Sequence, residues 1–301
     1  MPKISVIVCT YNRGDYVPGV LNSISGQNFP LSDYEIVFVN NNSNDSTAEN
    51  CQQFGDKNPE VNFKYFVEKK QGLSHARNRG IKESEGEILA FIDDDALAHA
   101  DYLLYMRKFF ENSSYSAGGG KIYPKYESRR PRWMSRFLEP VMSVIDLGNE
   151  VKNFPKNKFP IGANMMFRKK VFDRVGYFDT ELGRTGKNML GGEEKDLFFK
   201  MRAQNMTVGY VPDVVVSHII PDERLSRQFI KKQAKGIGKS ERIRAENYEA
   251  VKLGVTYFKE LLKWGATLVL AFYYALWLQF SKSEMLIKFR FWVSRGLFRN
   301  G

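Results

Sequence analysis

The sequence is poor in cysteine and has no strong compositional bias. Only Cys9 and Cys51 are present, too few for a disulfide-stabilised secreted domain, and this fits a reducing compartment. The 24 glycines and 11 prolines among 301 residues are ordinary numbers, which exclude a collagen-like or low-complexity chain. Because 43% of the residues are hydrophobic and 26% are charged, the chain has enough apolar material for a full core and is not wholly disordered.

The first residues lack the architecture of a cleavable signal peptide. A short apolar run ends at Thr10 and is followed directly by Tyr11, Asn12 and Arg13. We therefore expect the first part of the chain to lie in the cytosol. The length predicts one large domain, or a domain with an appendage.

Residues 1–223 have no net charge. They contain 29 Lys and Arg and 29 Asp and Glu, so the whole excess of +11 lies in residues 224–301, which have 16 basic and five acidic residues. A basic tail on a neutral body indicates a polyanionic partner for the tail alone, either nucleic acid or an anionic membrane surface. A solvated charged helix is the alternative.

The tail also lacks an apolar run long enough to be a clear membrane span. The 18 residues between Lys263 and Lys282 are uncharged, whereas a spanning helix needs roughly 20 apolar residues, with about 17 as the lower limit. Aromatic and basic residues alternate over 288–299, a mixture suited to the lipid headgroup region. We predict in-plane or shallow membrane attachment and no nucleic-acid binding; a single span and a buried helical subdomain remain open.

The apolar pattern predicts strands that alternate with helices. Short apolar runs predict strands at Ile4–Cys9, Tyr34–Val39, Asn62–Val67 and Ile88–Ile92. Helical spacing or start signals, including a capping box at Ser46–Glu49, predict helices over 17–24, 46–54, 74–82, 102–110, 165–175 and 193–203. A further strand is expected within 206–217. This alternation predicts an α/β fold with a mostly parallel, doubly wound sheet flanked by helices.

Three consecutive carboxylates, Asp93, Asp94 and Asp95, form the sharpest chemical signal. They follow the predicted strand Ile88–Ile92, and in open α/β sheets ligands bind beyond the carboxyl ends of strands. Oxygen ligands at this density suit Mg²⁺ or Mn²⁺ shared with a diphosphate. The alternative is a helix N-cap with two solvated neighbours.

A second acidic cluster follows two glycines at Gly191–Asp196. The glycines permit a loop that approaches a ligand closely, and a carboxylate beside a metal–diphosphate is able to take a proton from an attacking hydroxyl. Acidic residues at a helix start also favour the helix dipole, so this cluster alone is a weak signal.

Both clusters match a family pattern, since the chain resembles the family 2 glycosyltransferases over about residues 3–220. The matching pieces are short, but their order and spacing are specific. They are Ser5–Arg13, Val39–Ser43, Gly72–Asn78, Phe91–Asp95, Gly162–Asn164, Gly176–Asp179 and Gly192–Leu197. The resemblance implies a GT-A fold over residues 1–221, with residues 222–301 as a basic, apolar helical appendage.

The resemblance also implies an inverting transfer from a nucleotide-diphosphate sugar to a hydroxyl of a saccharide or lipid-linked acceptor. It implies Glu194 as general base, with Glu193 as the fallback, and Asp95 as a ligand of Mn²⁺ or Mg²⁺, with His218 as a further metal ligand. The residues implied to bind the nucleotide sugar are Thr10, Tyr11, Arg13, Asn40, Asn42, Arg77, Asp93, Asp94 and Asn164.

Two positions depart from the family pattern. Asn40 replaces the usual aspartate, keeping an acceptor oxygen but losing the charge, and so leaves the donor base open. Glu194 stands where aspartate is commoner and is longer by one methylene. The rival interpretations are a nucleotidyltransferase on a similar sheet and a non-catalytic, membrane-bound sensor of sugar nucleotides. A lipid-linked acceptor and the basic tail indicate the cytoplasmic face of a membrane and the synthesis of surface polysaccharide or glycolipid.

Overall fold

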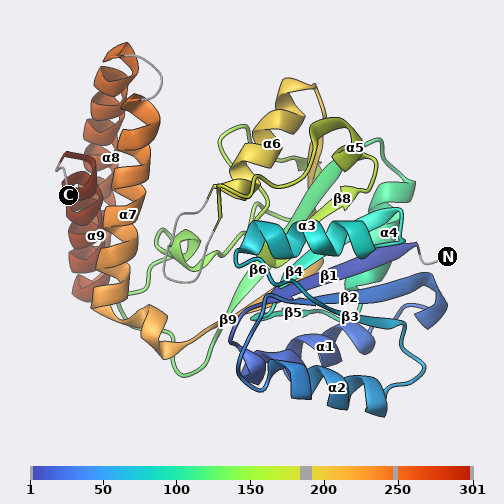
Figure 1. Ribbon diagram of the computed structural model, residues 1–301. Coiled ribbons are helices and arrows are strands. Elements are labelled where there is room, and N and C mark those ends of the chain that lie inside the picture. The colour runs from blue at the N-terminus through green and yellow to red at the C-terminus, as the bar shows by residue number, and fades with distance from the viewer. Residues whose placement is uncertain (1–2, 184–191, 247–249, 299–301) are drawn as a thin grey trace. The chain divides into compact units, whose positions relative to one another are not determined.

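The structure is a computed structural model that describes residues 3–183, 192–246 and 250–298. The chain forms two compact units (Figure 1). The sheet unit comprises Met1–Tyr123 and Ile145–Ile219, and the helical unit comprises Pro124–Val144 and Ile220–Gly301. The division into 1–221 and 222–301 stays a prediction, and the contacts within the chain also assign 124–144 to the helical unit.

The sheet unit is built on one mixed sheet. Its strands are β1 (Ile4–Thr10), β2 (Tyr34–Asn40), β3 (Phe63–Val67), β4 (Ile88–Asp93), β5 (Ala96–Ala98), β6 (Ala117–Tyr126), β7 (Lys152–Asn153), β8 (Met165–Arg168) and β9 (Val208–Ile220). The order is β3-β2-β1-β4-β8-β6-β9-β5, with β7 beside β9. The first four strands pair in parallel, whereas β4–β8, β6–β8, β5–β9 and β7–β9 are antiparallel.

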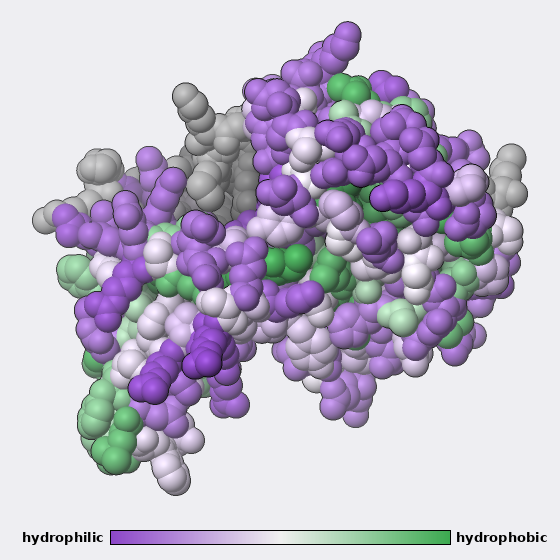
Figure 2. Space-filling model, turned by 90° about the horizontal axis from the view of Figure 1, so that it is seen from below, coloured by the Kyte–Doolittle hydropathy of each residue, from purple (hydrophilic) through white to green (hydrophobic). Residues whose placement is uncertain are grey.

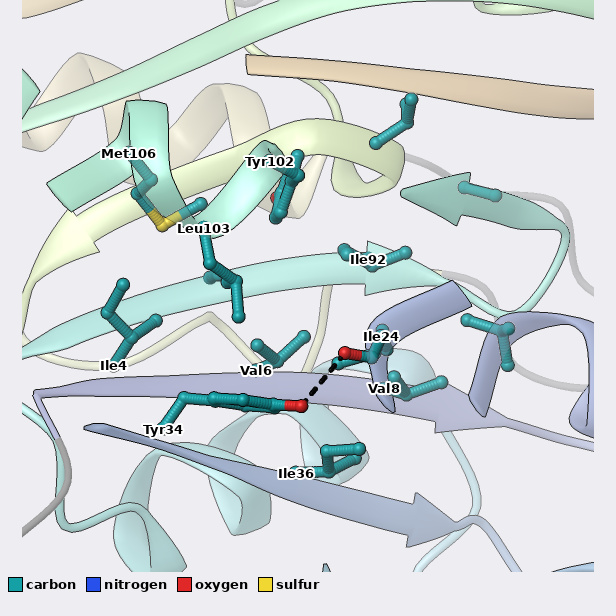
Figure 3. Packing of buried hydrophobic residues seen from close by; sticks show 14 of the residues in the cluster. Ile4, Val6, Val8, Ile24, Tyr34, Ile36, Ile92, Tyr102, Leu103 and Met106 are labelled. Atoms are coloured by element: carbon teal, nitrogen blue, oxygen red, sulfur yellow. Dashed lines mark hydrogen bonds between the residues drawn. The ribbon is translucent and has the colours of Figure 1, made fainter. Parts of the chain in front are cut away.

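Helices cover both faces of the parallel half of the sheet (Figure 1). They are α1 (Val17–Ser25), α2 (Thr47–Lys57), α3 (Leu73–Glu83), α4 (Tyr102–Glu111), α5 (Val171–Val175) and α6 (Glu193–Ala203). Successive strand residues point to opposite faces, so Val6 and Val8 share one core with α1, α2 and α4, while Ile7 lies in the other with α3, α5 and α6. Figure 3 shows the first of these cores, where the buried Tyr34 hydroxyl donates to the Ile24 carbonyl oxygen at 3.1 Å.

Most predicted elements of the sheet unit are confirmed within a few residues, but two local predictions are wrong. Residues 165–175 are not one helix, because Met165–Arg168 is the strand β8, which fills the sheet between β4 and β6, and only Val171–Val175 is helical. The capping box at Ser46 does not form. Instead, Asp45 Oδ1 accepts hydrogen bonds from the backbone N–H (3.1 Å) and hydroxyl (2.6 Å) of Thr47.

The long helices of the helical unit, within its described residues, are α7 (Arg227–Glu246), α8 (Ala250–Leu276) and α9 (Phe280–Phe298). Its core includes side chains from 124–144, such as Met134 and Leu138, together with Ile230, Tyr274 and Met285 of the helices. Helices α7 and α9 approach each other at two glycines. A Cβ on Gly238 would lie 2.0 Å from the Val293 carbonyl oxygen, and one on Gly296 would lie 2.1 Å from that of Lys235.

None of the helices in the described ranges is both long and apolar enough to cross a membrane.

Candidate active site

The carboxyl ends of the central parallel strands carry most of the predicted site residues. In the β-sheet register, Thr10 at the end of β1 pairs with Asn40 at the end of β2, and Cys9 pairs with Asp93 at the end of β4. This edge is where open α/β sheets bind ligands. The register alone therefore brings the segments around residues 10, 40 and 93 together.

The three aspartates do not start a helix. Asp93 is the last residue of β4, Asp94 and Asp95 form a turn into β5, and the next helix, α4, begins only at Tyr102. The N-cap interpretation of this cluster is therefore wrong, and its carboxylates are held by other side chains instead.

Asp94 is held between Thr10 and Arg13. The Thr10 hydroxyl donates to Asp94 Oδ2 at 2.5 Å, and Arg13 Nη1 donates to Asp94 Oδ1 at 2.6 Å. Burial raises the pKa of Asp94 to about 7, although the Arg13 guanidinium acts to lower it. Asp94 therefore anchors Arg13 and the end of β1.

Asp95 lies between a guanidinium and an imidazole. Arg13 Nη2 donates to its Oδ2 at 2.9 Å, while its Oδ1 is 3.2 Å from Nε2 of His218. Both Asp95 and His218 are buried. The contact is set by the antiparallel pairing of β5 with β9, in which Ala96 stands opposite His218.

Asp95 and His218 have the donor chemistry of a divalent-cation site. Carboxylate oxygen suits Mg²⁺ and Mn²⁺, and imidazole is a common ligand of transition metals. Within residues 3–183, 192–246 and 250–298, no group of three or more His, Cys, Asp or Glu side chains is arranged to hold a metal ion. Asp95 and His218 would therefore supply two protein ligands to a divalent cation. Its other ligands would be substrate phosphate oxygens and water, as is usual for Mg²⁺ bound with phosphates.

The buried Arg77 joins the two acidic clusters. Its Nη1 donates to Glu193 Oε1 at 3.0 Å and its Nη2 to Glu194 Oε1 at 2.9 Å, while Nη2 is also 3.5 Å from Asp93 Oδ1. The guanidinium carbon lies 5.4 Å from the centre of the Phe178 ring. One cation from α3 therefore holds carboxylates from the end of β4 and the start of α6, two segments about a hundred residues apart in the chain.

Glu194 is the more accessible of the two glutamates. Its side chain is 21% exposed, whereas that of Glu193 is 5% exposed and its Oε2 also accepts the backbone N–H of Gly192 at 2.9 Å. Both hydrogen bonds recorded for the Glu194 carboxylate go to Oε1, from Arg77 and from the Gly162 N–H at 2.8 Å. Burial raises the pKa of Glu194 to about 7, against the lowering effect of Arg77.

Gly162 leaves the space in which these groups meet. A Cβ at this position would lie 2.0 Å from Arg77 Nη2 and 2.8 Å from both Asp93 Oδ1 and Glu194 Oε1. No side chain fits there without displacing the guanidinium. Gly162 thus has two roles in the site: its lack of a side chain leaves room for the Arg77 guanidinium, and its N–H donates to Glu194 Oε1.

Asn40 and Asn42, both predicted to bind the nucleotide sugar, lie at and just after the end of β2. Asn40 is buried, its Nδ2 donates to the Tyr65 hydroxyl at 2.8 Å, and its Oδ1 accepts the Ser43 N–H at 2.8 Å. Asn42 has a φ of +60° and is exposed, as is Tyr11. Because both ends of the Asn40 amide are engaged within the protein, this residue holds the loop that carries Asn42.

Asn164 stands apart from the carboxylates. Its Nδ2 donates to the carbonyl oxygens of Lys121 (3.1 Å) and Val214 (2.8 Å), so the buried amide ties β6 to β9. Both of these side-chain hydrogen bonds go to strands of the sheet. Its neighbour Gly162, two residues before it, is the part of the Gly162–Asn164 motif that reaches Glu194.

Sequence reasoning missed Gly162 as a site residue, the joining role of Arg77, and Tyr65. A glycine directly before a predicted buried segment is a signal for close approach, and would have pointed to Gly162. Nothing near Arg77 in the sequence indicates its partners, since they lie 116 and 117 positions further along the chain.

A family model agrees with this geometry. The model described as glycosyl transferase family 2 matches residues 5–176, which include all of β1 but its first residue, together with β4, the three aspartates and Gly162. The chain belongs to glycosyl transferase family 2. The resemblance read from the sequence is thereby confirmed.

Curated relatives of this family align over part of their length. A Haloferax volcanii protein named glycosyltransferase AglE is 30% identical over 186 residues, which is 60% of this chain and 58% of the relative. The glucosyl-dolichyl phosphate glucuronosyltransferase of the same organism is 28% identical over 211 residues, 67% of this chain and 64% of the relative. The chain thus spans somewhat under two thirds of these two proteins.

Solved structures share the fold. The mannosyltransferase PcManGT from Pyrobaculum calidifontis, in complex with GDP-Man and Mn²⁺, is 21% identical with a TM-score of 0.62, covering 99% of this chain and 87% of that one. S. aureus TarS 1–349 in complex with UDP-GlcNAc is 22% identical with a TM-score of 0.54, covering 81% of this chain and 71% of that one. The predicted GT-A fold, with parallel central strands in a mixed sheet flanked by helices and with further carboxyl-terminal helices, is confirmed by this likeness.

Proposed function

We propose that the chain transfers a sugar from a nucleotide-diphosphate donor to a hydroxyl of a saccharide or lipid-linked acceptor, with inversion at the anomeric carbon. The observation that carries this proposal is the convergence of Asp93 and Glu194 on one guanidinium, that of Arg77. Arg77 holds Asp93, at the ligand-binding edge of the sheet, close to Glu194, a carboxylate that is able to accept a proton.

Glu194 is the proposed general base, in preference to Glu193. The acceptor hydroxyl attacks the anomeric carbon from the side opposite the diphosphate, and the bond from that carbon to the diphosphate oxygen breaks. Glu194 takes the hydroxyl proton on Oε2, since its Oε1 already accepts two hydrogen bonds. A base with a pKa near 7 is matched to proton transfer at neutral pH.

The donor is proposed to lie along the carboxyl edge of the sheet. Thr10, Tyr11, Arg13, Asn40 and Asn42 line the nucleotide side, and Asp93, Asp94 and Arg77 lie toward the ribose and sugar. Asn164 supports this edge through the sheet rather than by direct contact. Asp95 and His218 are the residues that would hold Mn²⁺ or Mg²⁺, and such a cation supplies positive charge against the departing diphosphate. In support, PcManGT and TarS are named in complexes with GDP-Man and UDP-GlcNAc.

We further propose that residues 222–301 attach the chain to an anionic membrane surface, on the cytoplasmic face, where a lipid-linked acceptor is available. The basic excess of these residues supports this placement. Among the relatives, one is named for a glucosyl-dolichyl phosphate acceptor and another for poly(ribitol-phosphate). These names agree with a role in glycolipid or surface polysaccharide synthesis.

A donor panel with the purified full chain tests the transfer. Nucleotide sugars are added with Mn²⁺ or Mg²⁺, binding is measured by thermal shift, and the released nucleotide is identified. We expect a nucleoside diphosphate as the product. Release of pyrophosphate would instead indicate nucleotidyl transfer, and donor binding without turnover on any acceptor would indicate a sensor.

The variant Glu194→Gln tests the base. It removes the proton acceptor but keeps the size of the side chain, so turnover is expected to fall about 10²–10⁴-fold while the donor-induced thermal shift remains. Glu60→Gln, the same change at an exposed position outside the site, is the matched control and should leave turnover unchanged. Near-normal turnover of Glu194→Gln would contradict the assignment.

A further inference from the structure

Helix α8 carries several polar side chains on its inner side, which faces α9. Glu260 is only 3% exposed, and its carboxylate accepts hydrogen bonds from Ser294 Oγ (2.8 Å) and Arg290 Nη1 (3.2 Å) of α9. The Trp264 indole N–H donates to the same Ser294 hydroxyl at 2.8 Å, and Thr267 is buried one turn further on. The side of α8 that contacts α9 is therefore lined by a hydrogen-bonded network.

The opposite side of α8 is apolar and exposed. Its large hydrophobic side chains recur at spacings of three and four residues, so they share one face of the helix. They are Phe258, Leu261, Leu262, Leu268, Val269, Phe272, Tyr273 and Leu276. The exposed Trp277 and Leu278 follow in the turn to α9, and the exposed Phe280 is the first residue of α9. Figure 2 shows hydrophobic surface gathered at one edge of the helical unit (lower left).

This polarity is the reverse of that of a surface helix in a water-soluble domain, which turns its apolar stripe to the core. Contiguous exposed apolar surface of this kind marks an interaction site, and polar groups turned toward the helix partners are typical of helices that face lipid. The outward face of α8 therefore requires an apolar partner.

A basic groove lies at the carboxyl-terminal end of this face. It has a volume of about 500 Å³, and the charged side chains that line it are Arg130, Arg132 and Lys282. Leu278 and Phe280, both exposed, lie on the same groove. Arg130 is paired with Glu139 at 2.5 Å, so the groove retains net positive charge beside its apolar side. Such a lining suits a phosphate group attached to hydrocarbon.

The net positive charge of the helical unit favours an anionic lipid surface over a second copy of the chain as the partner of this apolar face. The helical unit contains 21 Lys and Arg and nine Asp and Glu, whereas the sheet unit contains 24 and 25. A second copy of the helical unit would bring two strongly positive surfaces together, which opposes self-association. An anionic lipid surface complements both the basic charge and the apolar face.

We propose that the outward face of α8 and the groove at its end form a docking surface for a bilayer of anionic phospholipid. Helix α8 lies in the plane of the membrane, its apolar face enters the headgroup and upper acyl region, and the groove holds a lipid phosphate. This inference rests on the membrane attachment proposed for residues 222–301, and it assigns that attachment to particular side chains.

The in-plane orientation follows from length and from charge. The uncharged part of α8 runs from Trp264 to the helix end at Leu276, which is 13 residues and about 20 Å of helix at about 1.5 Å per residue. This length is well below the roughly 30 Å of the hydrocarbon core. Lys259 and Lys263 are exposed and directly follow Phe258 and Leu262, so this part of the apolar face is bordered by cations that belong at the headgroups.

Vesicle sedimentation tests the groove with the full chain. Vesicles of phosphatidylcholine with phosphatidylglycerol should bind the protein, and vesicles of phosphatidylcholine alone should bind it much less. Changing Arg130, Arg132 and Lys282 together to Gln should weaken binding on the order of 100-fold at low salt. The matched control changes three exposed lysines of the sheet unit, Lys57, Lys108 and Lys156, to Gln and should bind as the wild type does.

The apolar face is tested by Phe272→Ser, because Phe272 is 65% exposed and its removal leaves the core intact. This variant should lose vesicle binding, whereas Val151→Ser, at an exposed apolar residue of the sheet unit, should keep it. Equal binding of all variants would overturn the proposal. So would tight binding of inorganic phosphate without vesicle binding, or a dimer that Phe272→Ser dissociates in the absence of lipid.

Trp277 reports the depth. It is 65% exposed, and lipids brominated near the glycerol end of the chain should quench its fluorescence more than lipids brominated near the chain end. Trp277→Phe should remove this difference. Strongest quenching at the bilayer centre would overturn the in-plane orientation, and no quenching would overturn insertion.

These results are separate from those for the transferase chemistry. Failure of vesicle binding with intact release of nucleoside diphosphate would refute the docking surface and the membrane attachment on which it rests, but not the transfer reaction. Vesicle binding without turnover of any donor would refute the transfer reaction alone.

Discussion

The sheet unit and helix α8 of the helical unit differ in where their large apolar side chains lie. In the sheet unit, hydrophobic side chains such as Val6, Phe38 and Phe91 are buried on both sides of the sheet, and the acidic groups gather at one edge. In the helical unit, α8 buries Glu260 and exposes Phe272. This contrast supports the proposal that the outer face of α8 meets a non-aqueous neighbour, whereas the sheet unit keeps its large apolar side chains away from water.

The charges differ in the same way. The sheet unit is close to neutral, yet it concentrates Asp93, Asp94, Asp95, Glu193 and Glu194 around two arginines. The helical unit spreads a large positive excess over its surface. Local concentration of charge serves chemistry on one ligand, whereas a diffuse excess serves attraction to an extended anionic surface.

The same substitution in the two units should have very different effects on stability. Phe38→Ala removes a fully buried ring of the sheet core and should cost about 3–5 kcal/mol. Phe272→Ala, without lipid, should change stability by less than about 0.5 kcal/mol, because the ring is exposed. Differential scanning calorimetry compares the two variants, and similar losses of stability would show that α8 is covered in solution.

The local elements of the sheet unit could be predicted because their signals are local. The apolar runs that form β1, β2, β3 and β4 are short and bounded by turn residues, and each was placed within one residue. The segment Met165–Arg168 was predicted as helix because its strand character comes from pairing with β4 and β6, which the sequence around it does not encode. The pairing with β4 and β6 therefore makes Met165–Arg168 a strand.

The site could be predicted in part for the same reason. Asp93, Asp94 and Asp95 follow a recognisable strand, so their place at the sheet edge could be inferred. The contacts of Arg77 with Glu193 and Glu194 depend on the packing of α3 against α6, and no local pattern predicts them. The apolar composition of α8 could be predicted from the sequence. Which side of α8 is exposed could not, because that depends on how α9 packs against it.

Gly162→Ala should disrupt the site but not the sheet. The added Cβ would meet Arg77 Nη2 at 2.0 Å, so the guanidinium has to shift and releases Glu194 from its position. Displacements of about 1 Å near reacting groups cost on the order of 100-fold in rate, and we expect a loss of that size in kcat. Unchanged kcat, with melting temperature also unchanged, would show that Arg77 does not position the base.

The pH dependence of kcat/KM should report Glu194. The base acts only when deprotonated, and its pKa is raised to about 7, so activity should fall as the pH drops below about 7. Arg77 lowers this pKa, while Glu193 and Asp93 raise it. Arg77→Met should therefore move the acid limb upward by about 1–3 pH units.

Arg77→Lys is the matched variant, because it retains the positive charge and should keep the acid limb near its wild-type position. If the acid limb of the pH profile also stays in place in Arg77→Met, the limb does not report the protonation of Glu194 beside Arg77. Melting temperatures of both variants distinguish a shifted limb from a loss of folded protein.

Hydrogen–deuterium exchange of the full chain measures both halves of the comparison at once. Addition of a nucleotide sugar with Mn²⁺ should slow exchange in the sheet unit around residues 10–13, 93–95 and 193–197, and leave α8 unchanged. Addition of anionic vesicles should slow exchange around residues 268–280 and leave the sheet edge unchanged. Two results would contradict the account that the sheet unit binds the donor and α8 binds the membrane. One is slower exchange of α8 on addition of the nucleotide sugar; the other is unchanged exchange at the sheet edge with nucleotide sugar and at α8 with vesicles.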